Sequence, residues 1–129
     1  MPFFDLFQHD ADLLEINAGE TLFRQGESGA VMYVLVEGEA EIFIDGVSFE
    51  KCGPGSVVGE ISIIDHEPRR ATVVACVQSR FAVVNRKRFH FMLDETPGFA
   101  MAIMHVLTQR LARCDQRVIQ LTRANTAAL

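Results

Sequence analysis

The sequence predicts an α+β protein, in which an eight-stranded antiparallel β-roll of the jelly-roll type precedes carboxy-terminal helices. Before Asn85 the chain consists of short apolar runs separated by glycines, which is typical of short strands joined by tight turns. After Asn85 it contains one glycine, Gly98, and its apolar residues recur at helical spacing. The formal net charge changes at the same place, from −9 over residues 1–85 to +4 over residues 86–129.

Eight strands are expected within residues 13–84, at the regular short spacing of an all-β module. The stretch 39–45 alternates polar and apolar side chains, as a half-buried strand does. Asp45-Gly46 then predicts a hairpin with strand 47–51, because a type I′ turn needs a positive φ at both central residues. The remaining expected strands are 13–17, 20–25, 31–37, 56–58, 71–77 and 80–84.

Two helices are expected after the roll, over residues 86–94 and 97–122. Asn85 is a good amino-terminal cap for the first, and Thr96-Pro97 supplies a cap and a first-turn proline for the second. The second helix carries an apolar stripe at heptad-like spacing. The stripe either packs on the roll, or pairs with another subunit or moves with a ligand. Its residues are Ile103, Leu107, Leu111, Cys114, Val118 and Leu121.

Length and composition restrict the class of protein. A chain of 129 residues is expected to form a single domain over residues 1–129. The net charge of −5 argues against binding of nucleic acid by this chain alone, and no apolar run approaches a membrane span. The first eight residues do not have the pattern of a signal peptide. Three cysteines without a CxxC motif predict free thiols in a reducing compartment, and therefore a cytoplasmic protein.

The sequence indicates neither a metal site nor catalysis. The four histidines are scattered, with no HxH or HExxH motif. A cupin-like metal enzyme would need several ligands on facing strands, whereas the only histidines before residue 85, His9 and His66, lie outside the expected strands. No pair of titratable groups suggests acid–base catalysis. We therefore expect a binding protein and not an enzyme.

Residues 53–72 differ from the rest of the strand-and-turn pattern. Strand 56–58 runs into Gly59, where the backbone can approach a ligand closely, and the N–H groups of the turn that follows attract an anion. Arg69, at the end of the loop, has the forked donors that suit phosphate oxygens. Glu60 can accept hydrogen bonds from sugar hydroxyls. Together these features suit a phosphorylated sugar.

This stretch and the residues before it resemble the cyclic nucleotide-binding domain family over nearly the whole chain. The upstream resemblance lies in FRQGE at 23–27 and MYVL at 32–35. The most specific part is the family's phosphate-binding cassette, which reads GEISIIDHEPRRAT over 59–72. The resemblance implies a short cassette helix, a long carboxy-terminal lid helix, and cAMP or cGMP as the ligand with no other cofactor.

The resemblance also implies roles for individual residues. Arg69 matches the family arginine that binds the exocyclic oxygens of the cyclic phosphate, and Glu60 matches the glutamate that accepts from the ribose 2′-hydroxyl. The other residues expected around the ligand are Val57, Val58, Gly59, Ile61, Ser62 and Ala71. The candidate lid residues that would contact the base are Arg110, Leu111, Arg113 and Cys114.

Position 70 departs from the family pattern. The family usually carries a small residue there, alanine or serine in many cAMP binders and threonine where cGMP is favoured, whereas this chain has Arg70. Arg70 is a solvated side chain, a second phosphate contact, or a group that crowds the pocket. We include it among the candidate ligand-binding residues.

The function implied is that of a receptor, with cAMP favoured over cGMP. Binding at the cassette would pass a signal through movement or pairing of the carboxy-terminal helix, to a protein partner or in a homodimer. Two alternatives remain. The chain is the sensor domain of a Crp/Fnr-like transcription regulator, or of another larger protein, without its output domain. Otherwise it is a degenerate interaction module that binds no nucleotide.

Overall fold

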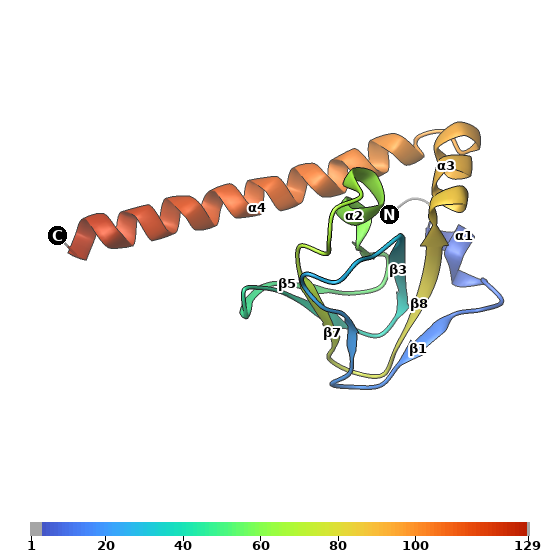
Figure 1. Cartoon of the computed structure of the whole chain (residues 1–129), viewed down its shortest axis with the longest axis horizontal. Coiled ribbons are helices and arrows are strands. Elements are labelled where there is room, and N and C mark those ends of the chain that lie inside the picture. The colour runs from blue at the N-terminus through green and yellow to red at the C-terminus, as the bar shows by residue number, and fades with distance from the viewer. Residues whose placement is uncertain (1–3, 129) are drawn as a thin grey trace. The chain divides into compact units, whose positions relative to one another are not determined.

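The computed structural model describes the backbone of residues 4–128 and the side chains of residues 5–125. It consists of two compact units, one ending at Thr96 and one beginning at Pro97. The first unit holds eight strands and three short helices (Figure 1). The strands are β1 (Leu14–Ile16), β2 (Thr21–Phe23), β3 (Val31–Glu37), β4 (Ala40–Ile44), β5 (Val47–Cys52), β6 (Val57–Val58), β7 (Thr72–Ala75) and β8 (Ser79–Asn85). The helices are α1 (Phe4–Gln8), α2 (Glu60–Asp65) and α3 (Arg86–Glu95).

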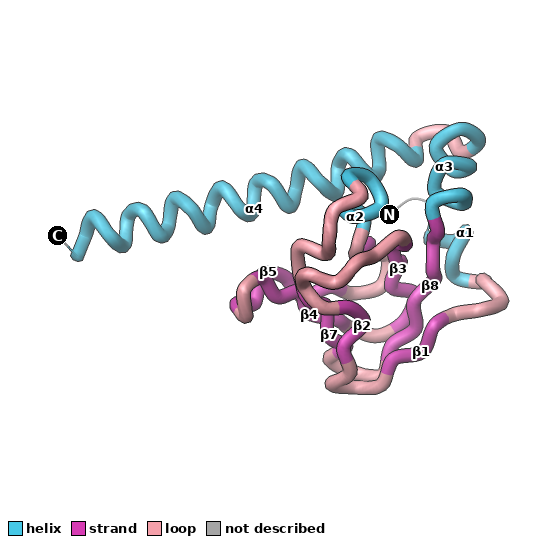
Figure 2. Tube along the Cα trace, in the orientation of Figure 1, coloured by secondary structure: helices cyan, strands magenta, loops and turns pink. Residues whose placement is uncertain are grey.

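The strands form two four-stranded antiparallel sheets, β1-β8-β3-β6 and β2-β7-β4-β5 (Figure 2). All eight predicted strands are present, and the predicted β-roll is confirmed. Buried apolar side chains from both sheets pack together in a core cluster. That core contains Phe23, Leu35, Ala40, Ile42, Phe49, Cys52, Val58, Val73 and Phe81.

The predicted Asp-Gly hairpin joins β4 to β5. Ile44 pairs with Val47, and the two residues between them have φ values of 51° at Asp45 and 78° at Gly46. Gln25 holds the turn from outside, since its Nε2 donates to Asp45 Oδ1 and its Oε1 accepts from the Asp45 N–H, both at 2.9 Å. The turn is therefore fixed by its own backbone preference and by a distant side chain.

The ends of α3 agree only partly with the sequence-based prediction. Asn85 caps the helix as predicted, with its side chain accepting from the Arg88 N–H at 2.8 Å. Thr96 closes the carboxyl end of α3 by donating its N–H to the Met92 carbonyl at 3.0 Å. It therefore does not begin the next helix. The short helix α1 before the roll has no counterpart in the prediction.

The second unit contains α4 (Phe99–Ala128), which is longer than the predicted range of 97–122. The helix begins after Gly98, whose φ is 82° and whose carbonyl accepts from the Ala102 N–H at 3.0 Å. It continues to Ala128 because no glycine or proline interrupts residues 99–128. No helix in the described part of the chain is long and apolar enough to cross a membrane.

Candidate functional site

The candidate site begins where β6 ends, at Gly59. This residue caps α2 with a φ of 79°, in the left-handed region that favours glycine. A Cβ there would lie 2.6 Å from Arg69 Nη1 and 3.3 Å from the Val31 carbonyl oxygen. Both the conformation and the space therefore require glycine. The group that lies close to the backbone here is the Arg69 side chain, and the close approach of a ligand to Gly59 remains a prediction.

Arg69 is a buried arginine, with 4% of its surface exposed. Its Nη1 donates to the Gly59 carbonyl at 3.1 Å, and its guanidinium carbon lies 4.3 Å from the Phe23 ring centroid and 5.8 Å from that of Tyr33. The two rings stack with centroids 5.9 Å apart. The Nε of Arg69 is buried and has no hydrogen-bond partner among the described residues. The fold thus fixes a cation with an unused donor next to Gly59.

The main chain of Arg69 is held as firmly as its side chain. Its N–H donates to the Glu27 carbonyl and its carbonyl accepts from the Gly26 N–H, both at 2.8 Å. These two bonds attach the end of the cassette loop to the turn between β2 and β3. The position of the guanidinium is therefore set by segments that are far apart in the sequence.

Several neighbours modify the electrostatics of this cation. Burial lowers the pKa of Arg69 from its ordinary value, while Tyr33, Glu27 and Glu60 act in the opposite direction. Arginine nevertheless remains charged in proteins. Glu60 is 2% exposed and is the first residue of α2, where a helix stabilises negative charge. Arg69 and Glu60 thus supply a donor-rich group and an acceptor to one site.

The other predicted cassette residues occupy the elements around this pair. Val57 and Val58 are buried in β6, and Ser62 is buried in α2. Ile61 is half-buried in α2, and Ala71 is half-buried immediately before β7. The structure therefore brings the end of β6, the start of α2 and the end of the loop together around Gly59.

Arg70 faces outward. Its side chain is 60% exposed, and its Nη2 lies 3.0 Å from Asp65 Oδ2. The other oxygen of Asp65 accepts from the Glu67 N–H at 2.9 Å. Asp65 thus braces the loop between α2 and Arg70, and Arg70 is held by that brace. A contact between Arg70 and a phosphate remains a prediction.

The candidate lid residues lie in α4, in the second unit. Leu111, Arg113 and Cys114 are exposed and Arg110 is half-buried. Their contact with a base remains a prediction. Within the described residues, no group of three or more histidine, cysteine or acidic side chains could hold a metal ion.

Three residues around Arg69 were not assigned a role from the sequence, namely Phe23, Gly29 and Tyr33. A Cβ on Gly29 would collide with the Arg69 guanidinium, so this glycine makes room for that group. Phe23 and Tyr33 provide the aromatic faces against which it lies. The available signal was the upstream pattern at 23–27 and 32–35, which contains both aromatic residues but does not indicate what they contact.

The site thus combines a β-roll, the short helix α2 and a loop that ends in a buried arginine. The family model described as "Cyclic nucleotide-binding domain" matches residues 13–96. This chain therefore belongs to the cyclic nucleotide-binding domain family.

Individual relatives agree with this membership, and a solved structure agrees with the fold. The chain is 41% identical over 81 residues to a cAMP-dependent protein kinase regulatory subunit of Yarrowia lipolytica, covering 62% of this chain and 22% of the relative. It is 35% identical over 97 residues to a cGMP-dependent protein kinase of Plasmodium berghei, and the match covers 75% of this chain and 11% of that relative. The fold matches the catabolite activator protein of Thermus thermophilus with a TM-score of 0.79 at 24% identity. The match covers 95% of this chain and 60% of that structure's chain. The chain thus spans less than a quarter of these two curated relatives.

Proposed function

We propose that this chain binds a cyclic nucleotide in the cassette over residues 59–72, with Arg69 holding the exocyclic oxygens of the cyclic phosphate. The observation that carries the proposal is the fixed, buried guanidinium of Arg69, whose Nε has no partner in the described part of the chain. A buried donor without an acceptor costs about 1–3 kcal/mol. A phosphate oxygen would satisfy that donor and bring the opposite charge.

The remaining roles follow from the chemistry of the groups around Arg69. Glu60 accepts a hydrogen bond from the ribose 2′-hydroxyl, since a carboxylate beside an anion is useful only toward a neutral donor or a cation. The main-chain N–H groups of Ile61, Ser62 and Ala71 complete the cradle for the phosphate. Val57 and Val58 border the sugar and the base. The work of this site is binding and not catalysis.

We favour cAMP over cGMP as the ligand. The family's cue for cGMP is a threonine at position 70, and this chain has no hydroxyl there. Arg70 does not replace that hydroxyl, because its guanidinium is paired with Asp65. The relative with 41% identity is named a cAMP-dependent protein kinase regulatory subunit, which supports the same ligand.

The signal would leave through α4, acting with the roll as one domain. If the ligand prefers one placement of this helix, binding shifts the population toward that placement. The stripe residues Leu111, Val118 and Leu121 are exposed and offer an apolar face to a protein partner or a second copy. The matches cover only a small share of each relative, which supports the proposal that this chain is a sensor domain of a larger protein. An odd number of cysteines without a CxxC motif supports a cytoplasmic location.

Isothermal titration with cAMP and, separately, with cGMP tests the binding proposal. The unmodified protein should bind cAMP more tightly than cGMP, and Arg69→Gln should weaken binding by about 10- to 150-fold, which corresponds to about 1.5–3 kcal/mol. Arg24→Gln is the matched control, because it removes the same charge from a side chain that is 70% exposed. If the folded, unmodified protein gives no heat with either nucleotide, the domain is an interaction module that binds no cyclic nucleotide.

A light-scattering measurement tests the role of α4. Size-exclusion chromatography with and without nucleotide should show a change of mass or elution volume if the helix pairs or moves. A monomer that elutes identically in both conditions would rule out signalling through dimerisation.

A further inference from the structure

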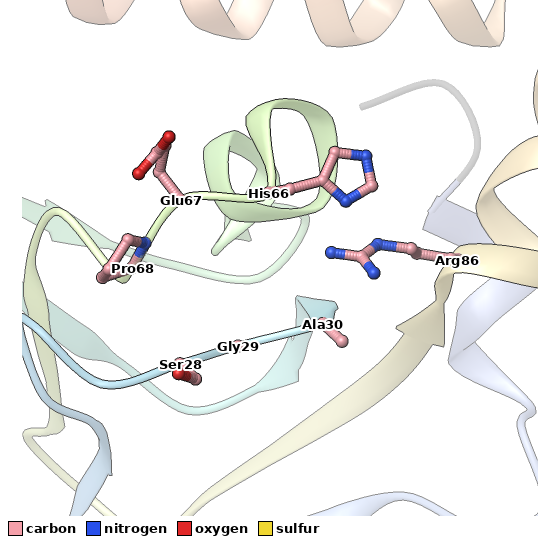
Figure 3. A pocket seen from close by; sticks show the side chains of 7 residues that line it. All are labelled: Ser28, Gly29, Ala30, His66, Glu67, Pro68 and Arg86. Atoms are coloured by element: carbon pink, nitrogen blue, oxygen red, sulfur yellow. The ribbon is translucent and has the colours of Figure 1, made fainter.

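A pocket of about 350 Å³ lies in the first unit beside the tip of the cassette (Figure 3). Three segments line it: the turn before β3, the loop after α2, and the first residue of α3. Its lining residues are Ser28, Gly29, Ala30, His66, Glu67, Pro68 and Arg86. Arg69 is not among them, so this pocket differs from the site around Arg69.

Arg86 is the principal charged group of this pocket. Its side chain extends from the start of α3 into the space between His66 and Ala30 (Figure 3). Its Nε is buried and has no hydrogen-bond partner among the residues that the structure describes. Since buried donors in folded proteins almost always have an acceptor, the missing partner of this N–H requires an explanation.

The start of α3 makes the unpaired arginine more unusual. The first turn of this helix contains Arg86, Lys87 and Arg88 and no acidic residue, although the amino-terminal end of a helix favours negative charge. Arg88 is neutralised by Asp10, whose two oxygens lie 2.7 and 3.0 Å from its guanidinium nitrogens. Arg86 has no such ion pair within the described residues. An anion in the pocket would supply the missing negative charge at the end of the guanidinium that enters the space.

The neighbouring side chains suit the same ligand. The His66 imidazole lies beside the end of the Arg86 side chain, and Ser28 lines the far side of the pocket, beyond Gly29 (Figure 3). The acidic lining residue, Glu67, points its carboxylate away from the guanidinium (Figure 3). The groups at the space that Arg86 enters are thus a cation and an imidazole, and Ser28 adds a hydroxyl to the lining farther away. All three groups can donate hydrogen bonds to an oxyanion.

We propose that this pocket is a second anion site, which binds a small oxyanion, a phosphate group or a carboxylate, through Arg86 with His66 and Ser28. Gly29 is common to both sites, because it lines this pocket and also contacts the Arg69 guanidinium. The second site nevertheless uses its own arginine. It does not depend on the binding of a cyclic nucleotide.

Amide NMR of the whole chain tests the proposal. The protein is titrated with inorganic phosphate, with acetate, and with potassium chloride at matched ionic strength, and no nucleotide is present. The amides of 28–30, 66–67 and 86–87 should shift and saturate with phosphate and with acetate but not with chloride. Phosphate should bind more tightly because it carries more charge near neutral pH. Shifts that do not saturate, or that chloride reproduces, would overturn the proposal.

A pair of neighbouring variants assigns the effect to Arg86. Arg86→Gln should weaken phosphate binding at least about tenfold, because it removes a charge-assisted contact. Lys87→Gln removes the same charge from an exposed neighbour and should leave the affinity unchanged. Equal affinities in the two variants would contradict the proposal.

Two further readouts keep the result interpretable. Amides of 60–62 report phosphate at the Arg69 site, and their shifts should persist in Arg86→Gln. If Arg86→Gln does not fold, Ser28→Ala takes its place and should weaken phosphate binding several-fold, whereas an unchanged affinity in that variant would count against the site.

Discussion

The guanidinium carbon of Arg69 lies 4.3 Å from the centre of the Phe23 ring, at the edge of the core of the β-roll. This contact links the end of the cassette loop to β2, about 46 residues earlier in the chain. Phe23 therefore acts in two ways, as a buried core side chain and as the surface on which the cation lies.

Replacing this ring should affect stability and ligand affinity together. Phe23→Leu is expected to lower the free energy of unfolding by about 1–3 kcal/mol, because it removes buried aromatic surface and the contact with the cation. It should also weaken nucleotide binding several-fold by loosening Arg69. Phe49→Leu is the control, since Phe49 is buried in the same core cluster. Chemical denaturation and calorimetry should show a loss of stability in both variants but a loss of affinity only in Phe23→Leu.

A second prediction concerns the space that Gly29 leaves for Arg69. Gly29 does not have a positive φ, so alanine suits its backbone, but the added Cβ would collide with the guanidinium. Gly29→Ala should therefore displace Arg69 and weaken nucleotide binding at least about tenfold. Gly53→Ala is the matched control, because a Cβ there meets no atom within 4 Å. Equal nucleotide affinities in the two variants would show that the position of Arg69 does not matter.

The brace between Asp65 and Arg70 should be sensitive to acid. The Glu67 N–H, and secondly Arg70, lower the pKa of Asp65 below its ordinary value of 3.8. Because the pKa is lower in the folded state, the brace stabilises the fold above about pH 3.8 and loses that effect as the pH falls through the folded value. Arg70→Ala should raise the pKa of Asp65 only part of the way back to its ordinary value, since the hydrogen bond from the Glu67 N–H remains. Carbon-detected NMR titration measures the pKa of Asp65 in the unmodified protein and in Arg70→Ala.

The same variant tests whether Arg70 contacts the ligand. With its guanidinium held by Asp65 and largely exposed, Arg70→Ala should change the nucleotide affinity by less than about threefold. Arg80→Ala, which removes another exposed arginine with an acidic partner, provides the reference. A tenfold loss confined to Arg70→Ala would instead place Arg70 at the phosphate.

The ion pair of Arg88 and Asp10 should contribute more to the free energy of unfolding than an exposed ion pair does. Its two short hydrogen bonds and the partial burial of Asp10 predict a coupling of about 1 kcal/mol in a double-mutant cycle with Arg88→Gln and Asp10→Asn. The pair of Arg80 and Glu15 is about half exposed and should give a smaller coupling. Thermal denaturation of the two cycles compares them directly.

Much of the fold could be predicted from the sequence because its signals are local. The left-handed turn at Asp45-Gly46 follows from the conformations that these two residues accept, and the Asn85 cap follows from one side chain and the N–H three residues later. Thr96 shows the limit of such signals. Threonine is a common first residue of a helix, but the N–H of Thr96 donates to the last turn of the preceding helix instead.

The surroundings of Arg69 and Arg86 could not be predicted in the same way. The ring of Phe23, the gap at Gly29 and the main-chain bonds of Gly26 and Glu27 reach Arg69 from segments some forty residues away. Their sequence pattern indicated a family but not a contact. Arg86 was read only as a helical residue, because a basic side chain next to a cap carries no sign that its Nε will be buried without a partner.

The two main-chain hydrogen bonds of Arg69 should also affect the rate at which a ligand associates. Because the residue is bonded through its N–H, its carbonyl and its Nη1, its rotational freedom is lost during folding and not during ligand association. An anion therefore meets a rigid donor, which lowers the entropic penalty of association and leaves its rate close to that set by diffusion and charge. In a stopped-flow experiment the bimolecular phase should be fast, and any slower phase that does not depend on concentration would come from a rearrangement elsewhere in the chain.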